Sequence, residues 1–207
     1  MKRFLGKVFF GKPEYNKPIR DSAYTSHRKN FLKIWNNEKH HDIGFEKILR
    51  LFLVAIQYIF PGLHVRNFFG KYGLIKRNVA IEFYVLFKTC LPVYFLYSGL
   101  YRHMITVVIS SYLLLETICY VSSLIFVADM FVNPRSYRLN ILMLFLNYME
   151  ISFCFAVVYA GLHLLGAQPN SIFDYVYFSI VTSTTIGYGD IHPVNDLGKL
   201  IVCIQAV

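Results

Sequence analysis

The sequence predicts an all-α integral membrane protein, and its composition and the length of its apolar runs support this class. Of the 207 residues, 56% are hydrophobic and only 16% are charged, whereas an average soluble domain is about 25% charged. Three apolar runs reach or exceed the roughly 20 residues that cross the hydrocarbon core as a helix. These runs are residues 79–99, 104–132 and 139–166.

A basic segment precedes the apolar runs. Residues 1–42 contain ten Lys or Arg residues and four acidic residues. Basic segments beside membrane helices usually lie on the cytoplasmic side, near anionic lipid. We therefore expect a cytoplasmic N-terminus at anionic lipid, in a protein of the plasma membrane. Nucleic acid is the other partner of basic tails, but no nucleic-acid-binding motif accompanies this one, so none is expected.

Residues 43–60 form an ambiguous apolar stretch, because charged residues interrupt its first half. It either spans the membrane or lies in the interface as an amphipathic helix. Residues 61–78 and 133–138 are also basic, and a spanning helix at 43–60 would place two basic segments on opposite sides. We therefore expect an interfacial helix and basic linker at 43–78, followed by a two-helix transmembrane scaffold at 79–132.

The segment after the third apolar run combines a short helix with a glycine-containing loop. Ser171, with Asp174 three residues later, fits a helix N-cap. The apolar residues 172–184 then predict a helix of about a dozen residues, which is too short to cross a bilayer and is typical of a re-entrant segment. This helix leads directly into the sequence TTIGYGD, residues 184–190.

The TTIGYGD segment carries two glycines one residue apart, Gly187 and Gly189. A strand alternates its carbonyl groups from side to side, so successive carbonyls on one side require unusual dihedrals at alternate residues. Glycine reaches φ > 0 without steric cost, and Ile186 and Tyr188 would then point away and pack behind the loop. Rings of such oxygens replace the hydration shell of a cation, as described for potassium-channel filters.

Residues 174–190, DYVYFSIVTSTTIGYGD, resemble the pore helix and filter of the potassium-channel superfamily, whose motif is T-V/I-G-Y-G-D. Residues 191–200 resemble the turn into the family's inner helix, and 139–166 would be the outer helix. The resemblance implies a pore-loop tetrameric cation channel fold over 139–207, preceded by two transmembrane helices. The inner helix is cut off at the last residue, so we expect either a longer natural protein or a fragment that does not conduct alone.

The resemblance also implies a role for each filter residue. The K⁺ ions would be coordinated by Thr185, Ile186, Gly187, Tyr188 and Gly189. Thr184 would support the filter, Tyr177 and Phe178 would form part of an aromatic cuff around Tyr188, and Asp190 would hold the outer mouth by hydrogen bonds. Some family members carry an acid where this chain has Val181, so the partner of Asp190 is left open. One filter copy per chain implies a homotetramer.

These features predict a potassium-selective channel subunit that conducts K⁺ passively through a filter of backbone carbonyls. The alternative is a non-conducting, pore-like regulatory or assembly subunit. We expect no enzyme, because the sequence shows no nucleophile–base or metal constellation. K⁺ at the filter would be the only metal, and no organic cofactor is expected.

Three ionisable residues lie inside the apolar runs, where such groups are costly and usually paired. Lys88 and Glu116 fall near mid-membrane on helices joined by a short turn, so we predict that they form an intramembrane pair. An ion or proton pathway is the functional alternative. Glu150 has no evident cationic partner, and we expect it to bond to hydroxyl groups such as those of Ser179 or Thr182.

The run 104–132 contains no Lys or Arg. Voltage-sensing relatives carry a cation at every third residue of the helix before the pore, so strong voltage sensing through this helix is not expected. Asp129 lies near the cytoplasmic end of the run, and we expect it to pair with Arg135 or Arg138.

Overall fold

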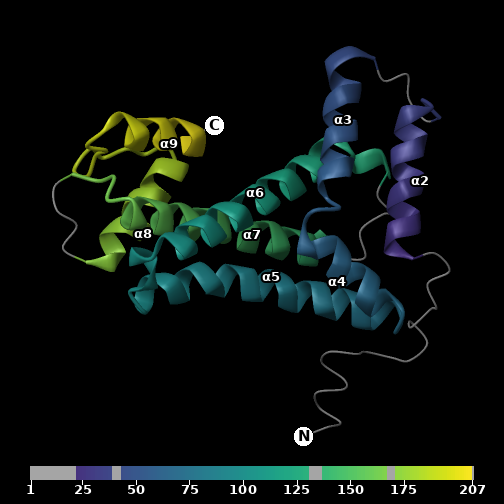
Figure 1. Ribbon diagram of the computed structural model, residues 1–207, viewed down its shortest axis with the longest axis horizontal. Coiled ribbons are helices and arrows are strands. Elements are labelled where there is room, and N and C mark those ends of the chain that lie inside the picture. Colours follow the sequence, from purple (N-terminus) through teal and green to yellow (C-terminus); the bar gives the residue numbers. More distant parts are fainter. Residues whose placement is uncertain (1–21, 39–42, 131–136, 167–170, 207) are drawn as a thin grey trace, which may run out of the picture. The chain divides into compact units, whose positions relative to one another are not determined.

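A computed structural model describes residues 22–38, 43–130, 137–166 and 171–206 (Figure 1). Within these residues every regular element is a helix, apart from one isolated β-bridge between Leu165 and Pro193. The predicted all-α class is therefore confirmed. The chain divides into two compact units. Unit 1 comprises Met1–Val85 and Cys119–Asn140, and unit 2 comprises Leu86–Ile118 and Ile141–Val207.

The described α-helices are α2 (Ala23–Trp35), α3 (Gly44–Ile56), α4 (Pro61–Gly70), α5 (Leu74–Tyr97), α6 (Met104–Phe126), α7 (Tyr137–Gly161), α8 (Ile172–Ser183) and α9 (Asp196–Ala206). Helices α2 and α4 were not expected, because their residues were assigned to the basic N-terminal segment and the basic linker. The other six lie at, or close to, predicted positions. Two short 3₁₀ helices, η2 (Leu100–Arg102) and η3 (Ala128–Met130), follow α5 and α6.

Three of these helices, α5, α6 and α7, are long and apolar enough to cross a membrane. The pair α3 and α4 would count as a fourth, broken span if taken together, because the two helices are bent by 61° at a short break. Length and composition do not choose between a bent span and an interfacial pair. The interfacial position of residues 43–60 therefore stays a prediction.

Helix α5 begins earlier than the apolar pattern indicated. It starts at Leu74, so Lys76 and Arg77 lie in its first turn and not in a linker. Long basic side chains are accepted at the end of a membrane helix because their charged ends reach the headgroup region. The apolar run alone therefore places the start of the span too late.

In unit 1, helix α2 packs along α3 (Figure 1). Their shared core contains Ile34 of α2, Leu53 and Val54 of α3, and Val127, all of which are buried. The opposite side of α3 carries exposed apolar residues, among them Phe45 and Ile48. Helix α3 therefore carries apolar side chains both on its packed face and on its outer face.

An ion pair joins α3 to η3 within unit 1. The Arg50 Nη2 atom lies 2.6 Å from Asp129 Oδ1, and Arg50 is almost fully buried. The sequence led us to expect Arg135 or Arg138 as the partner of Asp129. The observed partner is Arg50, which lies 79 residues earlier in the chain. Arg135 lies outside the described residues, and Arg138 is exposed at the start of α7.

Acidification is expected to weaken the packing of α2 on α3, because His27 is held neutral there. Its Nε2 atom lies 2.7 Å from the Val54 carbonyl oxygen, and its ring meets Tyr58 edge-on. Burial lowers the pKa of His27 from 6.5. The hydrogen bond to Val54 opposes this effect in part, and the charge of Arg66 lowers the pKa further. The unfolded state then binds the proton more readily, so stability is present above pH 6.5 and is lost as pH falls through the lowered pKa.

The measurement is hydrogen exchange of the α2 amides between pH 7.5 and 5, corrected for intrinsic exchange rates. The His27→Gln variant keeps a donor for the Val54 carbonyl but cannot titrate, so its protection should change less with pH. An equal pH dependence in both proteins would assign the effect to another group.

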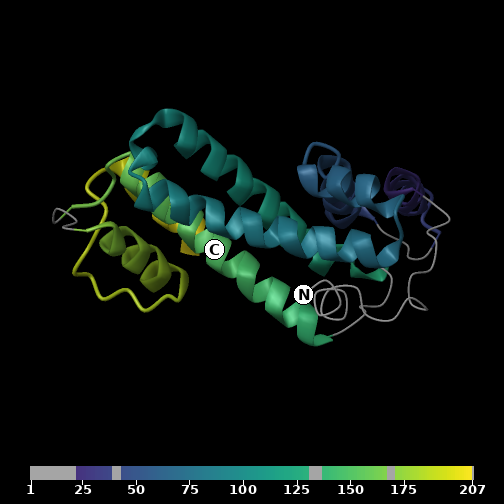
Figure 2. The same ribbon diagram turned by 90° about the horizontal axis from the view of Figure 1, so that it is seen from below.

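In unit 2, helix α7 is buried on two faces and positions the remaining helices (Figures 1 and 2). One face carries Phe155, Val158 and Tyr159, which pack against Val107 of α6 and Phe178 of α8. The other face carries Ala156, Val157 and Ala160, which pack against Phe95 and Leu96 of α5.

The end of α7 approaches the α5–α6 turn closely. A Cβ atom added to Gly161 would lie 2.6 Å from the Tyr101 carbonyl oxygen and would also collide with the Val107 side chain. Glycine is therefore the residue that allows this approach. The chain leaves α7 at this fixed point and proceeds to α8.

Candidate functional site

The candidate site begins with helix α8, whose first turn is capped as predicted. The Ser171 N–H donates to Asp174 Oδ2 over 3.0 Å, which forms half of a capping box. The helix has 12 residues and is therefore only about 18 Å long. This length is too short to cross a bilayer, as expected of a re-entrant helix.

Thr184 closes the other end of α8. Its N–H donates to the Ile180 carbonyl over 2.9 Å, and its hydroxyl donates to the same oxygen over 2.8 Å. The next two residues continue this pattern, because Thr185 N–H donates to Thr182 O and Ile186 N–H donates to Val181 O. The first part of the TTIGYGD segment is thus held against the last turn of α8 by backbone hydrogen bonds.

The backbone of the TTIGYGD segment is left-handed at every second residue. The φ angles are +58° at Thr185, +57° at Gly187 and +81° at Gly189. The expectation that both glycines adopt φ > 0 is confirmed. An extended chain in which every second residue is left-handed no longer points successive carbonyl groups to opposite sides. A row of oxygens on one side requires this conformation.

The left-handed conformation of Thr185 was not foreseen from the sequence. A β-branched residue with φ > 0 is a true backbone outlier, and it costs about 1–2 kcal/mol. Such strain persists only where the surroundings over-determine it and is common at functional sites. The available signal was the period of two, since Thr185 stands two residues before Gly187, as Gly187 does before Gly189.

Tyr177 of α8 contacts the far end of the loop. Its hydroxyl donates to Asp190 Oδ2 over 2.9 Å, and its ring stacks on Tyr188 with centroids 6.4 Å apart and planes at 1°. Accepting this bond, the Asp190 carboxylate raises the pKa of Tyr177 above its usual range, so the phenol keeps its proton. Tyr177 is therefore the partner of Asp190 that the sequence left open.

Phe178 lies on a different side of α8 from Tyr177. It is buried, and its ring meets Tyr159 of α7 edge-on with centroids 5.0 Å apart. Within the chain, Phe178 therefore contacts α7. Of the two aromatic residues predicted to contact Tyr188, Tyr177 is the one that does so. Consecutive residues of a helix point in directions about 100° apart, so Tyr177 and Phe178 face different neighbours.

Gln205 of α9 connects α7, α8 and α9, and sequence reasoning did not single it out. Its Nε2 donates to the Ser179 carbonyl over 2.8 Å and to the Ser183 hydroxyl over 2.7 Å. Its Oε1 accepts from the Tyr159 hydroxyl over 2.7 Å. The signal in the sequence was a lone amide in the apolar run LIVCIQAV, since a polar group in such a run normally finds partners.

The chain after the loop returns to the end of α7. Gly166 N–H donates to the His192 carbonyl over 2.8 Å, and Val194 N–H donates to the Leu164 carbonyl over 2.9 Å. The two ends of the re-entrant segment are therefore tied to each other. This closure fixes where α9 begins relative to α7.

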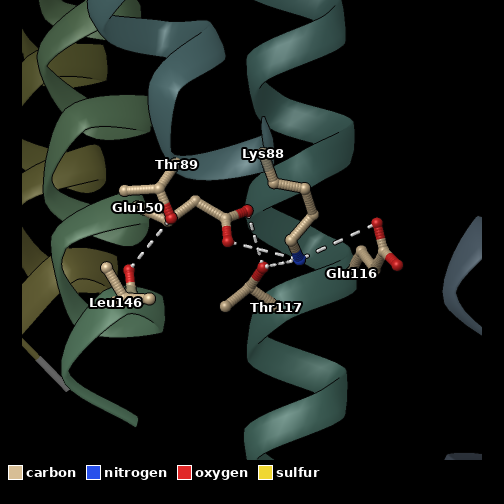
Figure 3. A network of polar contacts seen from close by, with 6 residues as sticks. All are labelled: Lys88, Thr89, Glu116, Thr117, Leu146 and Glu150. Carbon is tan, nitrogen blue, oxygen red and sulfur yellow. Dashed lines mark hydrogen bonds and ion pairs between the residues drawn. The ribbon is translucent and has the colours of Figure 1, made fainter. Parts of the chain in front are cut away.

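A second polar group lies in unit 2, away from the loop, between α5, α6 and α7 (Figure 3). The Lys88 Nζ atom is 3.9 Å from Glu116 Oε2 and 3.3 Å from Glu150 Oε2, and it donates to Thr117 Oγ1 over 2.6 Å. The Thr117 hydroxyl in turn donates to Glu150 Oε1 over 2.8 Å. The predicted pair of Lys88 with Glu116 is confirmed.

The expectation for Glu150 was wrong. Its partners are Lys88 and Thr117, whereas the hydroxyl of Ser179 donates to the Ser152 carbonyl over 2.7 Å. Glu150 is fully buried, so the closer of the two Lys88 contacts goes to the carboxylate with no access to solvent. The sequence could not show this because it does not fix the rotation of α7 relative to α5.

Comparison with known proteins concerns the C-terminal third of the chain. Residues 143–207 match the family described as "Ion channel". "Two pore potassium channel a" of Oryza sativa subsp. japonica is 40% identical over 68 residues, which is 33% of this chain and 19% of the relative. "Potassium channel K2" of Plasmodium falciparum is 60% identical over 35 residues, which is 17% of this chain and 2% of the relative.

This segment is therefore similar to potassium channels. A third relative, the "Hyperpolarization-activated voltage-gated potassium channel" of Methanocaldococcus jannaschii, is 46% identical over 44 residues, or 20% of this chain and 21% of the relative. The chain therefore spans about a fifth, or less, of the length of these curated potassium channels. No solved structure matches the chain.

Proposed function

We propose that the chain is a subunit of a potassium-selective channel, in which four copies of the TTIGYGD segment surround one axis and conduct K⁺ passively. The observation that carries this proposal is the left-handed backbone at Thr185, Gly187 and Gly189. It follows directly after a helix too short to span the membrane. The match of residues 143–207 to the ion-channel family supports the same function.

In this proposal the backbone oxygens of the filter replace the water around K⁺, which is the cargo. They belong to Thr185, Ile186, Gly187, Tyr188 and Gly189. The contact of Tyr177 with Asp190 and Tyr188 would hold the outer end of the filter. No organic cofactor takes part, because conduction needs no covalent chemistry.

Assembly into a homotetramer is supported by apolar surface around the filter. Ile186 is 54% exposed and Tyr188 is 68% exposed in the single chain. Three residues of α9 with helical spacing, Leu197, Leu200 and Ile204, are each at least 50% exposed. Exposed apolar side chains in such number mark a site for a partner chain or for lipid. In the tetramer, neighbouring subunits would cover the exposed side chains of Ile186 and Tyr188.

We assign the remaining regions on the pattern of charge and hydropathy. Residues 139–207 form the pore module and 79–132 the two-helix scaffold. Residues 43–78 lie in the interface, and the basic residues 1–42 lie in the cytoplasm against anionic lipid. The plasma membrane is the proposed location.

Ion flux into liposomes tests the proposal. The protein, expressed at its full natural length and reconstituted, should dissipate an imposed K⁺ gradient, while an equal Na⁺ gradient should persist. A dye that reports compensating proton movement gives the rate in both cases. Liposomes without protein provide the baseline.

The oligomeric state of the same preparation must be measured by cross-linking or mass photometry. Tetramers without K⁺ flux would overturn the channel proposal and would instead support a non-conducting, pore-like subunit. Equal K⁺ and Na⁺ flux would retain a pore but overturn its selectivity.

A further inference from the structure

A pocket of about 150 Å³ lies within unit 1, at the point where α2 begins and α4 leads into α5. One water needs only about 10–15 Å³ of such space, so the pocket has room for a polyatomic group. It is lined by Ser22, Ala23, Arg66, Asn67, Gly70, Lys71 and Arg77. None of these residues belongs to the segment that matches the ion-channel family.

The lining of the pocket is positively charged. Arg66, Lys71 and Arg77 contribute three cations, and the described lining residues include no Asp or Glu. The charge of Arg66 acts on Arg77, and like charges in a partly desolvated site repel each other. The Nε atom of Arg77 is buried and has no hydrogen-bond partner among the described residues. The pocket thus presents donors and positive charge to a bound anion.

Helix α2 adds to this positive field. It begins at the pocket, since Ser22 is its N-cap and Ala23 is its first residue, and both line the cavity. The N-terminus of a helix carries a partial positive charge and backbone N–H groups without partners in the helix. The Ser22 side chain accepts from Thr25 N–H and the Ser22 carbonyl accepts from Ser26 N–H, so the N–H groups of Ala23 and Tyr24 are the ones that face a ligand. A guanidinium group beside a helix N-terminus is well suited to phosphate.

The position in the chain indicates where the phosphate comes from. Arg77 is in the first turn of α5, one of the three helices that can cross the membrane. Phe68 and Tyr72, on either side of Lys71, are both more than half exposed. Exposed aromatic residues next to the end of a spanning helix are typical of the membrane–water interface. The pocket therefore lies at the level of lipid headgroups.

We propose that this pocket binds the phosphate headgroup of an anionic lipid, preferentially a phosphomonoester. Such a headgroup carries more charge than a phosphodiester and leaves its outer oxygens free for the two arginines. The lipid would join α2 to the start of α5 and so link the amphipathic segment to the membrane-spanning part of the chain. This proposal does not depend on conduction, because it concerns binding alone.

Binding of short-chain lipids to the detergent-solubilised, full-length protein provides the test. The probes are dioctanoyl phosphatidic acid, dioctanoyl phosphatidylserine and dioctanoyl phosphatidylcholine, with inorganic phosphate as the soluble source. Native mass spectrometry counts the bound lipid, and thermal shift gives its affinity. We expect phosphatidic acid to bind more tightly than the other three probes.

Arg66→Gln and Arg77→Gln should each weaken phosphatidic acid binding about tenfold, since each removes a charge-assisted hydrogen bond. Lys76→Gln is the matched control, because it removes one positive charge from the same turn of α5 at a residue that does not line the pocket. Arg77→Lys keeps the positive charge but loses the planar guanidinium group that can bind phosphate with two hydrogen bonds. It replaces Arg77→Gln in the test if that variant does not fold.

Two results would overturn the proposal. If Lys76→Gln weakens binding as much as the arginine variants, the interaction is general surface attraction and not this pocket. If inorganic phosphate binds as tightly as phosphatidic acid and with the same arginine dependence, the site takes a soluble phosphate and not a lipid. The wild-type comparison of the four probes stands even if every variant fails to fold.

Discussion

Replacement of Gly187 by alanine is expected to abolish K⁺ flux while leaving the subunit folded. Gly187 has φ of +57°, and a Cβ atom added there would meet nothing within 4 Å in the chain. The cost is therefore conformational, at about 1–2 kcal/mol for an L-residue in the left-handed region. Relaxation of the backbone to φ < 0 would relieve the strain and turn the carbonyl groups away from their row.

In the proposed tetramer this penalty occurs four times around one pore. About 1 kcal/mol in each subunit adds to roughly 4 kcal/mol per pore, which corresponds to a rate lower by on the order of a thousandfold. The liposome assay should then show no K⁺ flux above the baseline. The thermal midpoint of the reconstituted protein should change by only a few degrees.

Gly99→Ala is the matched control for this variant. Gly99 also has a positive φ, of +73°, and an added Cβ there meets nothing within 4 Å. It precedes η2 and is not part of the TTIGYGD segment. Its variant should therefore carry similar strain but conduct normally. Equal loss of flux in both variants, or full flux in Gly187→Ala, would contradict the assignment of Gly187 to the filter.

Lys88→Met is expected to cause the largest loss of stability among single changes in unit 2. The methionine has a similar length but leaves two carboxylates, Glu116 and Glu150, without their shared ammonium group. Lys88 and Glu116 are each 4% exposed and Glu150 is fully buried. Removing one member of a buried ion pair costs about 3–5 kcal/mol, because the remaining charge is left uncompensated. The thermal midpoint should fall by roughly 10 °C.

The double variant Lys88→Met, Glu150→Gln separates lost charge from lost packing. The glutamine oxygen can still accept from Thr117, but the charge of Glu150, the more deeply buried of the two carboxylates, is gone. If charge dominates, the double variant should recover more than half of the lost stability, and the two single effects should not add. Additive effects would show that Lys88 stabilises the helices through its packing alone.

The conformation of α8 and the TTIGYGD segment could be predicted from sequence because its signals are local. The Ser171–Asp174 cap, the short length of α8 and the spacing of Gly187 and Gly189 each depend on neighbours in the chain. The apolar length of a spanning helix is equally local. The alternation at Thr185 was missed because threonine carries no intrinsic preference for φ > 0.

The long-range contacts could not be predicted in the same way. The partner of Asp129 is Arg50, on a helix far away in sequence, and that of Glu150 is Lys88. Each pair depends on how one helix is rotated about its axis against another, and an apolar helix gives little sign of that rotation. The basic pocket of unit 1 is a mixed case, because Arg66, Lys71 and Arg77 are close in sequence but the start of α2 is brought to them only by the fold.

Gln205 has a mechanical consequence. One amide bonds to Tyr159 of α7 and to Ser179 and Ser183 of α8, and Ser183 is the residue immediately before the TTIGYGD segment. A force applied along α9 is therefore delivered to the base of that segment before these hydrogen bonds break. The position of α9 and the geometry of the loop are thus coupled through the hydrogen bonds of Gln205.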